Sequence, residues 1–150
     1  MQKVKNLIGM EMEPYTFKVE QGKIREFVQA IGDSNPIYYD IESAKREGFE
    51  NIPIPLTFLT AVEFWGGDNF LEHLSNFQVN PVRVVHGEQE YDLIQDIYAG
   101  DILTVTLKVV NVVVKHGSTG GMDLITTENK YKNQKNELVA ISKGVTIHRH

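Results

Sequence analysis

The chain of 150 residues contains no cysteine. Disulfide bonds, thiolate nucleophiles and cysteine-ligated zinc sites are therefore excluded. The sequence also lacks an apolar run close to the roughly 20 residues that cross a bilayer. No long apolar stretch follows the first, basic residues 1–6. We therefore expect a cytoplasmic protein with no secretory signal and no membrane partner.

Positive charge is also in short supply. Fifteen Lys and Arg residues face 20 Asp and Glu residues, which gives a formal net charge of −5. A general nucleic-acid binder needs a basic surface, so no nucleic-acid partner is expected. Hydrophobic residues make up 41% of the chain, and no linker, repeat or low-complexity segment divides it. The sequence predicts one domain over residues 1–150 with a real core.

The first half of the sequence predicts short elements between turns rich in Pro and Gly. Residues 14–20 alternate and favour a short strand. Residues 21–31 place apolar side chains at helical spacing, and the Gly-Asp-Ser-Asn-Pro segment at 32–36 must end that helix. Asp40 is positioned to cap a further helix over 41–47, which Gly48 ends.

An almost wholly apolar segment follows at residues 56–65. It begins after Pro55 and stops before two glycines. We predict a buried helix, because Pro suits the first turn of a helix. A buried strand is the alternative, since Thr, Val and aromatic residues favour sheets.

The second half of the sequence predicts long strands over residues 82–94, 102–115, 122–133 and 138–148, separated by short turns. Such strands predict an antiparallel meander, whose apolar face must be covered. The segment 56–65 is the obvious cover. The expected architecture is α+β, with a long central helix wrapped by a curved antiparallel sheet, which is the hot-dog fold.

Several segments, in order along the chain, resemble the MaoC-like dehydratase family. Residues 30–40, Ala-Ile-Gly-Asp-Ser-Asn-Pro-Ile-Tyr-Tyr-Asp, resemble the motif of (R)-specific enoyl-thioester hydratases. Further segments of this chain resemble the branch of that family with an N-terminal, FAS1-like dehydratase domain. They lie at residues 44–49, 52–58, 85–91, 98–101, 115–117 and 136–140. The chain is also similar to the small subunits of mycobacterial-type (3R)-hydroxyacyl-thioester dehydratases. There, one subunit carries the catalytic pair and the other shapes the acyl pocket.

This resemblance implies interconversion of (R)-3-hydroxyacyl and trans-2-enoyl thioesters of CoA or acyl carrier protein, without a cofactor. It implies a homodimer, or a heterodimer with a related hot-dog subunit. The family motif holds water with an Asp and a His five residues later. Asp33 matches that Asp, but Tyr38 stands in the position of the His. A phenol with a pKa near 10 is a poor base at pH 7. Therefore a partner completes the site, another residue replaces the His, or the activity is absent.

The candidate catalytic residues are Asp33 and Tyr38, and each candidate residue has a structural alternative. Asp33 and Asn35 also suit an Asx turn that ends the helix. Substrate-binding candidates are Asn35, the start of the central helix (Pro55, Leu56, Thr57 and Phe58) and His86. Backbone N–H groups at a helix start can bind a thioester carbonyl, but Pro55 lacks one. His86, or Glu88 beside it, is either a substitute base or part of a solvated strand with a Gly bulge.

Two other functions remain open. An acyl-CoA thioesterase needs a carboxylate beside the thioester, which Asp33, Glu63 or Glu88 could supply. A non-catalytic acyl-thioester-binding subunit agrees with Tyr38 in the His position. No metal site is expected, because among the histidines only His148 and His150 have ligand-like spacing, at a chain end expected to fray.

Overall fold

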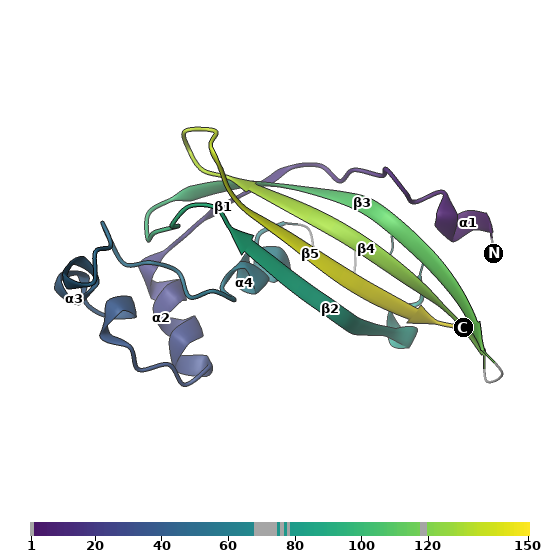
Figure 1. Ribbon diagram of the computed structural model, residues 1–150, viewed down its shortest axis with the longest axis horizontal. Helices are drawn as coiled ribbons and strands as arrows, with labels where there is room; N and C mark the ends of the chain where they lie inside the picture. The colour runs from purple at the N-terminus through teal and green to yellow at the C-terminus, as the bar shows by residue number, and fades with distance from the viewer. Residues whose placement is uncertain (1, 68–74, 76, 78, 118–119) are drawn as a thin grey trace.

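The computed structural model describes residues 2–67, 75, 77, 79–117 and 120–150. Their centre is a curved, five-stranded antiparallel sheet, and α2 and α3 lie beyond one end of it (Figure 1). Along the sheet the strands run in the order β1-β3-β4-β5-β2. The strands are β1 (Tyr15–Lys18), β2 (Val84–Leu93), β3 (Ile102–Gly117), β4 (Gly120–Lys132) and β5 (Leu138–Arg149).

The predicted meander is confirmed for β3, β4 and β5, and it is wrong for β2. That strand pairs with β5, at the opposite edge of the sheet from β1. The chain after β2 crosses the end of the sheet, where the Ile54 N–H donates to the Ile97 carbonyl at 2.9 Å. It then reaches β1, where the Gly100 N–H donates to the Val19 carbonyl at 2.7 Å. β3 therefore starts beside β1.

Helices α2 (Gln21–Ala30) and α3 (Ile41–Arg46) lie where the sequence predicts them. The predicted cap of α3 is confirmed, because the Asp40 carboxylate accepts the Ser43 N–H at 2.9 Å. Local capping and breaking residues were sufficient to locate these two helices. The structure adds α1 (Gln2–Lys5) and 3-10 turns at Pro36–Tyr38 and Pro81–Arg83, which were not predicted.

The central helix α4 spans Leu59–Trp65, so it is shorter than the predicted 56–65. Residues 56–58 form a turn instead. Helix rather than strand is confirmed, but burial on all sides is wrong. Leu59 and Val62 are fully buried, whereas Phe64 is 47% and Trp65 78% exposed. The sheet covers one face of the helix, and the apolar residues of the other face stay accessible in the single chain.

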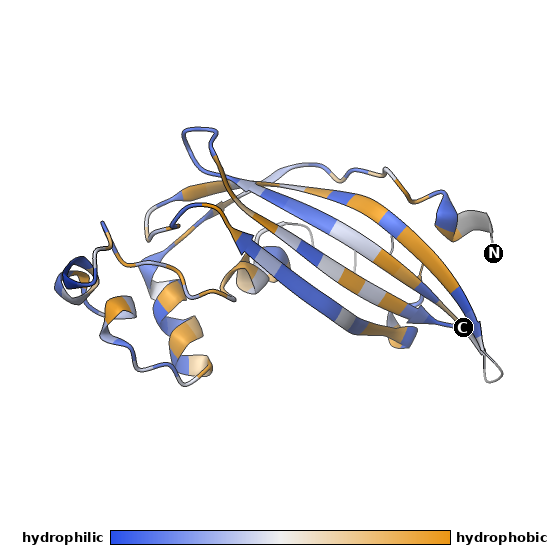
Figure 2. Cartoon of the chain, viewed as in Figure 1, coloured by the Kyte–Doolittle hydropathy of each residue, from blue (hydrophilic) through white to orange (hydrophobic). Residues whose placement is uncertain are grey.

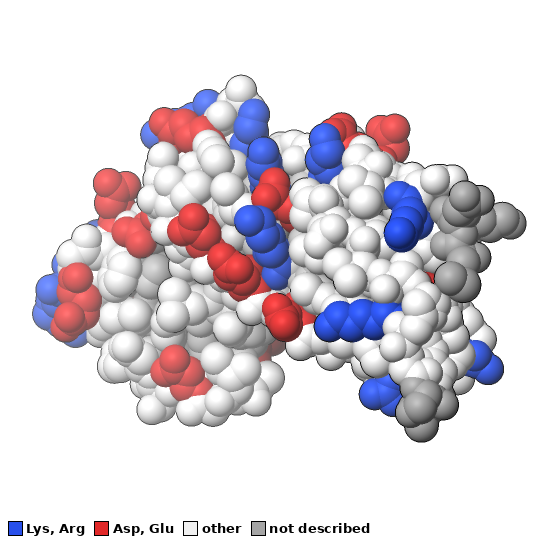
Figure 3. Space-filling model, turned by 45° about the vertical axis from the view of Figure 1, so that its right-hand side comes forward, with Lys and Arg blue, Asp and Glu red and all other residues white. Residues whose placement is uncertain are grey.

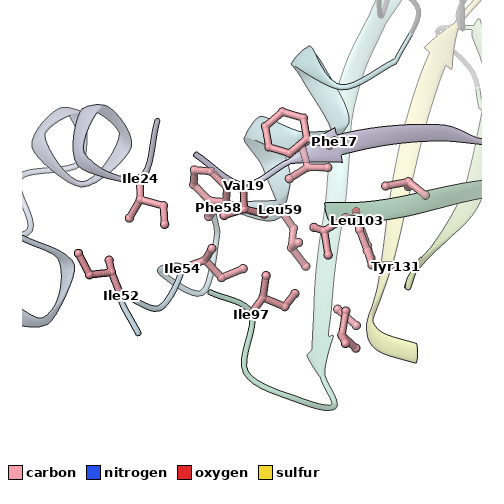
Figure 4. Packing of buried hydrophobic residues seen from close by; sticks show 14 of the residues in the cluster. Phe17, Val19, Ile24, Ile52, Ile54, Phe58, Leu59, Ile97, Leu103 and Tyr131 are labelled. Carbon is pink, nitrogen blue, oxygen red and sulfur yellow. The ribbon is translucent and has the colours of Figure 1, made fainter. Parts of the chain in front are cut away.

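Two apolar clusters fill the inside of the molecule. Strand residues alternate between apolar and polar, as the bands along β3 and β5 show (Figure 2). In the larger cluster, Phe58 is fully buried and lies beside Phe17 (Figure 4). Its ring packs edge-on against those of Phe17 and Phe27, with ring centroids 6.4 and 5.6 Å away. The smaller cluster lies further along the sheet and comprises Leu7, Phe77, Val79, Val109, Val112 and Ile125.

Truncation of Phe58 tests the larger cluster. Phe58→Ala should lower the free energy of unfolding by about 3–5 kcal/mol, because it removes a fully buried aromatic ring. Urea denaturation at fixed protein concentration measures this. Leu56, two residues earlier, is 70% exposed, so Leu56→Ala should change stability by less than about 0.5 kcal/mol. Equal losses in the two variants would contradict the assignment of Phe58 to the core.

Candidate active-site cavity

A cavity of about 480 Å³ lies between α4 and the inner face of the sheet. Ligand-binding pockets usually measure about 300–1,000 Å³. Its walls come from α4, β1 and the four long strands. The apolar part of the lining consists of Phe64, Phe77, Val84, Val85, Leu107 and Val145. The polar part includes Tyr15, Thr60, Glu63, His86, Gln89 and Asn129.

The cavity arises from small and polar residues between the two apolar clusters. On β4, Tyr131 and Ile125 each belong to one cluster, and Thr127 and Asn129 lie between them on the same face. Gly144 on β5 pairs with Thr127. A Cβ at Gly144 would lie 3.1 Å from the Gln89 amide oxygen, so a larger residue would crowd the space. The inner face is therefore hollow at this level of the sheet.

The carboxylate of Glu63 ties α4 to the sheet beside the cavity. Its Oε1 accepts hydrogen bonds from the Tyr131 hydroxyl at 2.5 Å and the Ser142 hydroxyl at 2.5 Å. The Asn129 amide donates to the same oxygen at 3.2 Å. Burial raises the pKa of Tyr131, and the charge of Glu63 raises it further. Burial and the same carboxylate also raise the pKa of Tyr15. Both phenols therefore stay protonated and act as donors.

Gln89 supplies an unused donor among the residues that line the cavity. Its Nε2 is buried and has no hydrogen-bond partner among the described residues. A buried unpaired donor costs about 1–3 kcal/mol. Tyr91, on the same face of β2, is bonded to the hydroxyl of Thr60 on α4. A ligand oxygen within reach of Gln89 would satisfy the free donor.

The motif residues lie outside this cavity and form turns. The Oδ1 of Asp33 accepts the Asn35 N–H at 2.9 Å, and the Asp33 carbonyl accepts the Tyr39 hydroxyl at 2.8 Å. Asn35 caps the following 3-10 turn by accepting the Ile37 N–H at 3.2 Å. The Asx-turn alternative for Asp33 and Asn35 is therefore confirmed as a structural role. Their catalytic and substrate-binding roles stay predictions.

Tyr38 packs partly buried against the larger apolar cluster. Burial raises its pKa, and the nearby Asp33 charge adds to the shift. A raised pKa makes the phenol still harder to deprotonate near neutral pH. Tyr38 can still donate a hydrogen bond, and its predicted catalytic role stays a prediction.

The other predicted binding residues divide into two groups. Thr57 and His86 line the cavity. Pro55 and Phe58 are buried outside it, and Leu56 is exposed. The Phe58 N–H is engaged in a turn with the Pro55 carbonyl at 2.9 Å. Their role in binding the thioester carbonyl stays a prediction.

The bulge predicted beside His86 is confirmed by the register shift between His86 and Glu88. His86 lies opposite Thr146, at the mouth of the hollow face. Sequence reasoning missed Gln89 and Asn129, and considered Glu63 only as a thioesterase carboxylate. Inward polar positions in otherwise apolar strands are the signal that points to such residues.

The surface carries no large area of one charge in the view of Figure 3, where acidic and basic side chains are interspersed among the described residues. The carboxylate of Glu128 forms ion pairs with two lysines: its Oε1 lies 3.7 Å from Lys130 Nζ and its Oε2 lies 3.7 Å from Lys143 Nζ. No helix among the described residues is long and apolar enough to cross a membrane.

Comparison with known protein families places the chain in a family of dehydratase-like domains. A family model described as "FAS1-like, dehydratase domain region" matches residues 6–142. A UPF0336 protein of Streptomyces avermitilis is 34% identical over 135 residues, which cover 89% of this chain and 85% of that protein. A UPF0336 protein of Streptomyces coelicolor is 32% identical over 135 residues, with 89% and 87% covered.

Solved structures agree with the hot-dog architecture. The HadBC (3R-hydroxyacyl-ACP dehydratase) complex of Mycobacterium tuberculosis contains a chain with a TM-score of 0.79 and 25% identity, and 94% of this chain and 96% of that chain are covered. A chain of the ChsH1-ChsH2 complex of the same organism has a TM-score of 0.76 at 22% identity, with 98% and 87% covered. The predicted α+β hot-dog fold is confirmed.

The turn at Asp33 can be tested separately from any catalytic role. Asp33→Asn keeps an oxygen that can accept the Asn35 N–H, so stability should change little. Asp33→Ala removes this acceptor and should lower the free energy of unfolding by about 1 kcal/mol. Urea denaturation of both variants checks this. Equal stability of Asp33→Ala and the wild type would contradict the structural role.

The buried phenols predict a loss of stability at alkaline pH. The pKa of Tyr131 is raised above its ordinary value in the folded state. Above about pH 10 the unfolded chain therefore releases tyrosine protons that the folded chain keeps, and stability falls as pH rises. Urea midpoints between about pH 8 and pH 11 should show this fall. Tyr131→Phe should make the fall of the urea midpoint with pH less steep. An unchanged fall in this variant would contradict the contribution of Tyr131.

Proposed function

Because this chain belongs to the FAS1-like dehydratase family, we propose that it is the acyl-thioester-binding subunit of a hot-dog hydratase/dehydratase. Its substrate class is the (R)-3-hydroxyacyl or trans-2-enoyl thioester of CoA or acyl carrier protein. The supporting observation is the cavity under α4, which has apolar walls and a free donor but excludes Asp33 and Tyr38. In this proposal a partner subunit carries the Asp and His that move protons.

The cavity suits an acyl thioester because its apolar walls can contact the acyl chain and its polar groups can bind the thioester end. Each methylene that leaves water for the apolar wall contributes about 0.8 kcal/mol. The thioester carbonyl and the 3-hydroxyl need hydrogen-bond partners, for which Gln89 offers its free Nε2. Thr57 and His86 line the same cavity and can contact the polar end of the substrate.

The missing base supports a divided enzyme. Addition or removal of water needs a group that exchanges a proton near neutral pH. Asp33 is engaged in a turn, and the pKa of Tyr38 is raised. The relative in the HadBC complex belongs to a (3R)-hydroxyacyl-ACP dehydratase that is itself a complex. A second hot-dog subunit is the simplest source of the missing pair.

Exposed groups on this chain support such a partner. Strand β2 ends the described sheet, so one edge of it offers unpaired backbone groups to a further strand. Val82 and Ile94, which flank β2 in the sequence, are 90% and 47% exposed. Large apolar side chains beside an open strand edge are typical of a surface that another chain covers. Either a second copy or a related hot-dog subunit fits this description.

A thioesterase is the second candidate, and Glu63 is the observation that favours it. It is the carboxylate among the described lining residues. Its Oε1, however, accepts hydrogen bonds from Tyr131, Ser142 and Asn129. These donors compete for the lone pairs that a general base would use. The main role of Glu63 in this network is therefore structural, because it joins α4 to β4 and β5.

Acyl-CoA binding provides the first test, with two neighbouring threonines as a matched pair. Thr127 lines the cavity, and Thr126 lies on the opposite face of β4. Thr127→Trp should weaken binding of dodecanoyl-CoA, measured by calorimetry, more than tenfold. A tenfold change in Kd corresponds to about 1.4 kcal/mol, which is the loss expected when about two methylenes, at ~0.8 kcal/mol each, are no longer buried. Thr126→Trp should bind as the wild type does, and equal binding by both variants would place the acyl chain elsewhere.

Hydration of trans-2-enoyl-CoA, followed at the enoyl absorbance, separates the candidates within the same experiment. The wild-type chain alone should bind but not hydrate, and should gain activity with a hot-dog subunit that carries the Asp and His. Tyr38→His should gain activity if the motif lacks only its base. Activity of the wild type alone that Asp33→Ala abolishes would instead show a complete hydratase. Release of free CoA, lost in Glu63→Gln, would show a thioesterase.

A further inference from the structure

Three potential metal ligands meet at the end of the sheet opposite α2 and α3, near the C-terminal residue (Figure 1). Asp123 on β4 pairs directly with His148 on β5. His150 follows two residues later, so its side chain lies on the same face as that of His148. The Asp123 Oδ2 lies 2.8 Å from His150 Nε2 and 3.5 Å from His148 Nδ1.

The carboxylate of this cluster is buried. The side chain of Asp123 is 3% exposed, and those of His148 and His150 are 17% and 34% exposed. Buried carboxylates are found paired or bound to metals, because an isolated charge is costly away from water. Among the described residues, the ion pairs of Asp123 are those with these two imidazoles. The site therefore contains one buried carboxylate and two imidazoles, and no Lys or Arg among the described residues pairs with that carboxylate.

We propose that Asp123, His148 and His150 form a binding site for one divalent first-row transition-metal ion, of which Zn²⁺ is the probe. Two imidazole nitrogens and a carboxylate oxygen are a donor set that zinc and its neighbours accept. Three protein ligands leave a further position for water. Sequence spacing pointed to His148 and His150 but not to the third ligand, because Asp123 lies 25 positions before His148 in the chain.

The distances are close to those that zinc needs. Tetrahedral bonds of about 2.0–2.2 Å place neighbouring ligand atoms roughly 3.3–3.5 Å apart. One ligand atom from each residue lies within 4.8 Å of the other two. Small rotations of the imidazoles therefore suffice. The Asn80 N–H now contacts His148 Nε2 at 3.4 Å, and this long contact is lost when His148 Nδ1 binds the metal and Nε2 carries the proton.

Gly121 makes room for one of the ligands. A Cβ at Gly121 would lie 2.8 Å from His150 Nδ1. The His150 N–H also donates to the Gly121 carbonyl at 2.9 Å, which continues the pairing of β5 with β4. A side chain at Gly121 would therefore crowd the imidazole of His150, and its Cβ would also lie 3.3 Å from the Lys115 carbonyl oxygen. The position of the ring depends on this glycine.

The site is separate from the acyl cavity, since none of its three ligands lines that cavity. The metal would link β4 to β5 at the end of the sheet. It would bind the folded state and not the unfolded state. Metal binding to the folded state raises the unfolding temperature in proportion to the logarithm of metal concentration above the Kd. This readout does not depend on any acyl-thioester activity.

Titration of untagged, metal-free protein with ZnCl2 tests the site, by calorimetry and by thermal unfolding. We expect one Zn²⁺ per chain and a raised Tm. Asp123→Asn and His150→Gln should each weaken zinc binding by at least about tenfold, as loss of a ligand requires. Gly121→Ala should weaken it too. Asp96→Asn, a carboxylate that follows β2 at the opposite end of the sheet from the cluster, should bind zinc as the wild type does.

Three outcomes would overturn the proposal. They are no zinc binding by the wild type with ZnCl2 in excess, unchanged binding by His150→Gln, and equal loss in Asp96→Asn. If Asp123→Asn fails to fold, His150→Gln decides alone. Its side chain is one-third exposed at the end of β5, so the substitution should leave the fold intact.

Discussion

The hydrogen bonding of one carboxylate, that of Glu63, holds the short central helix against the sheet. Helix α4 has seven residues and buries only the side of Leu59 and Val62. A helix this short has little stability by itself. Donors from β4 and β5 meet the carboxylate at 2.5 Å, which places the helix at a fixed distance above the strands. The cavity exists because the helix is held there by polar contacts, in place of apolar side chains that would fill the space.

Strand periodicity then arranges the inner face of the sheet into levels. Along β4 the inward residues pass from Tyr131 in the larger cluster, through Asn129 and Thr127, to Ile125 in the smaller one, and end at Asp123. Polar residues interrupt this apolar face in two places, at Asn129 and Thr127 and again at Asp123. Each such interruption has a cost unless its groups are paired. Asn129 and Thr127 line the cavity under α4, and Asp123 contacts the two histidines.

Local signals in the sequence were sufficient for most elements but not for the site. Asp40 as a cap and the Gly-Asp-Ser-Asn-Pro breaker predicted α3 and the end of α2, because capping depends on neighbours in the chain. The position of β2 beside β5 was not predictable in this way, since pairing depends on contacts between distant residues. For the same reason Gln89 and Asp123 were missed: their partners, or the lack of them, depend on cross-strand register.

The position of the motif explains why resemblance to a hydratase does not require chemistry on this chain. Asp33 Oδ1 accepts the N–H of Asn35, and the Tyr39 hydroxyl fixes the backbone of the same turn. These bonds stabilise the end of α2 whether or not water is activated there. Tyr38 keeps the aromatic packing of that turn, and burial raises the pKa of its phenol, which makes loss of the proton harder near neutral pH. Folding therefore preserves the motif as a turn, so its presence in the sequence does not by itself assign proton transfer to this chain.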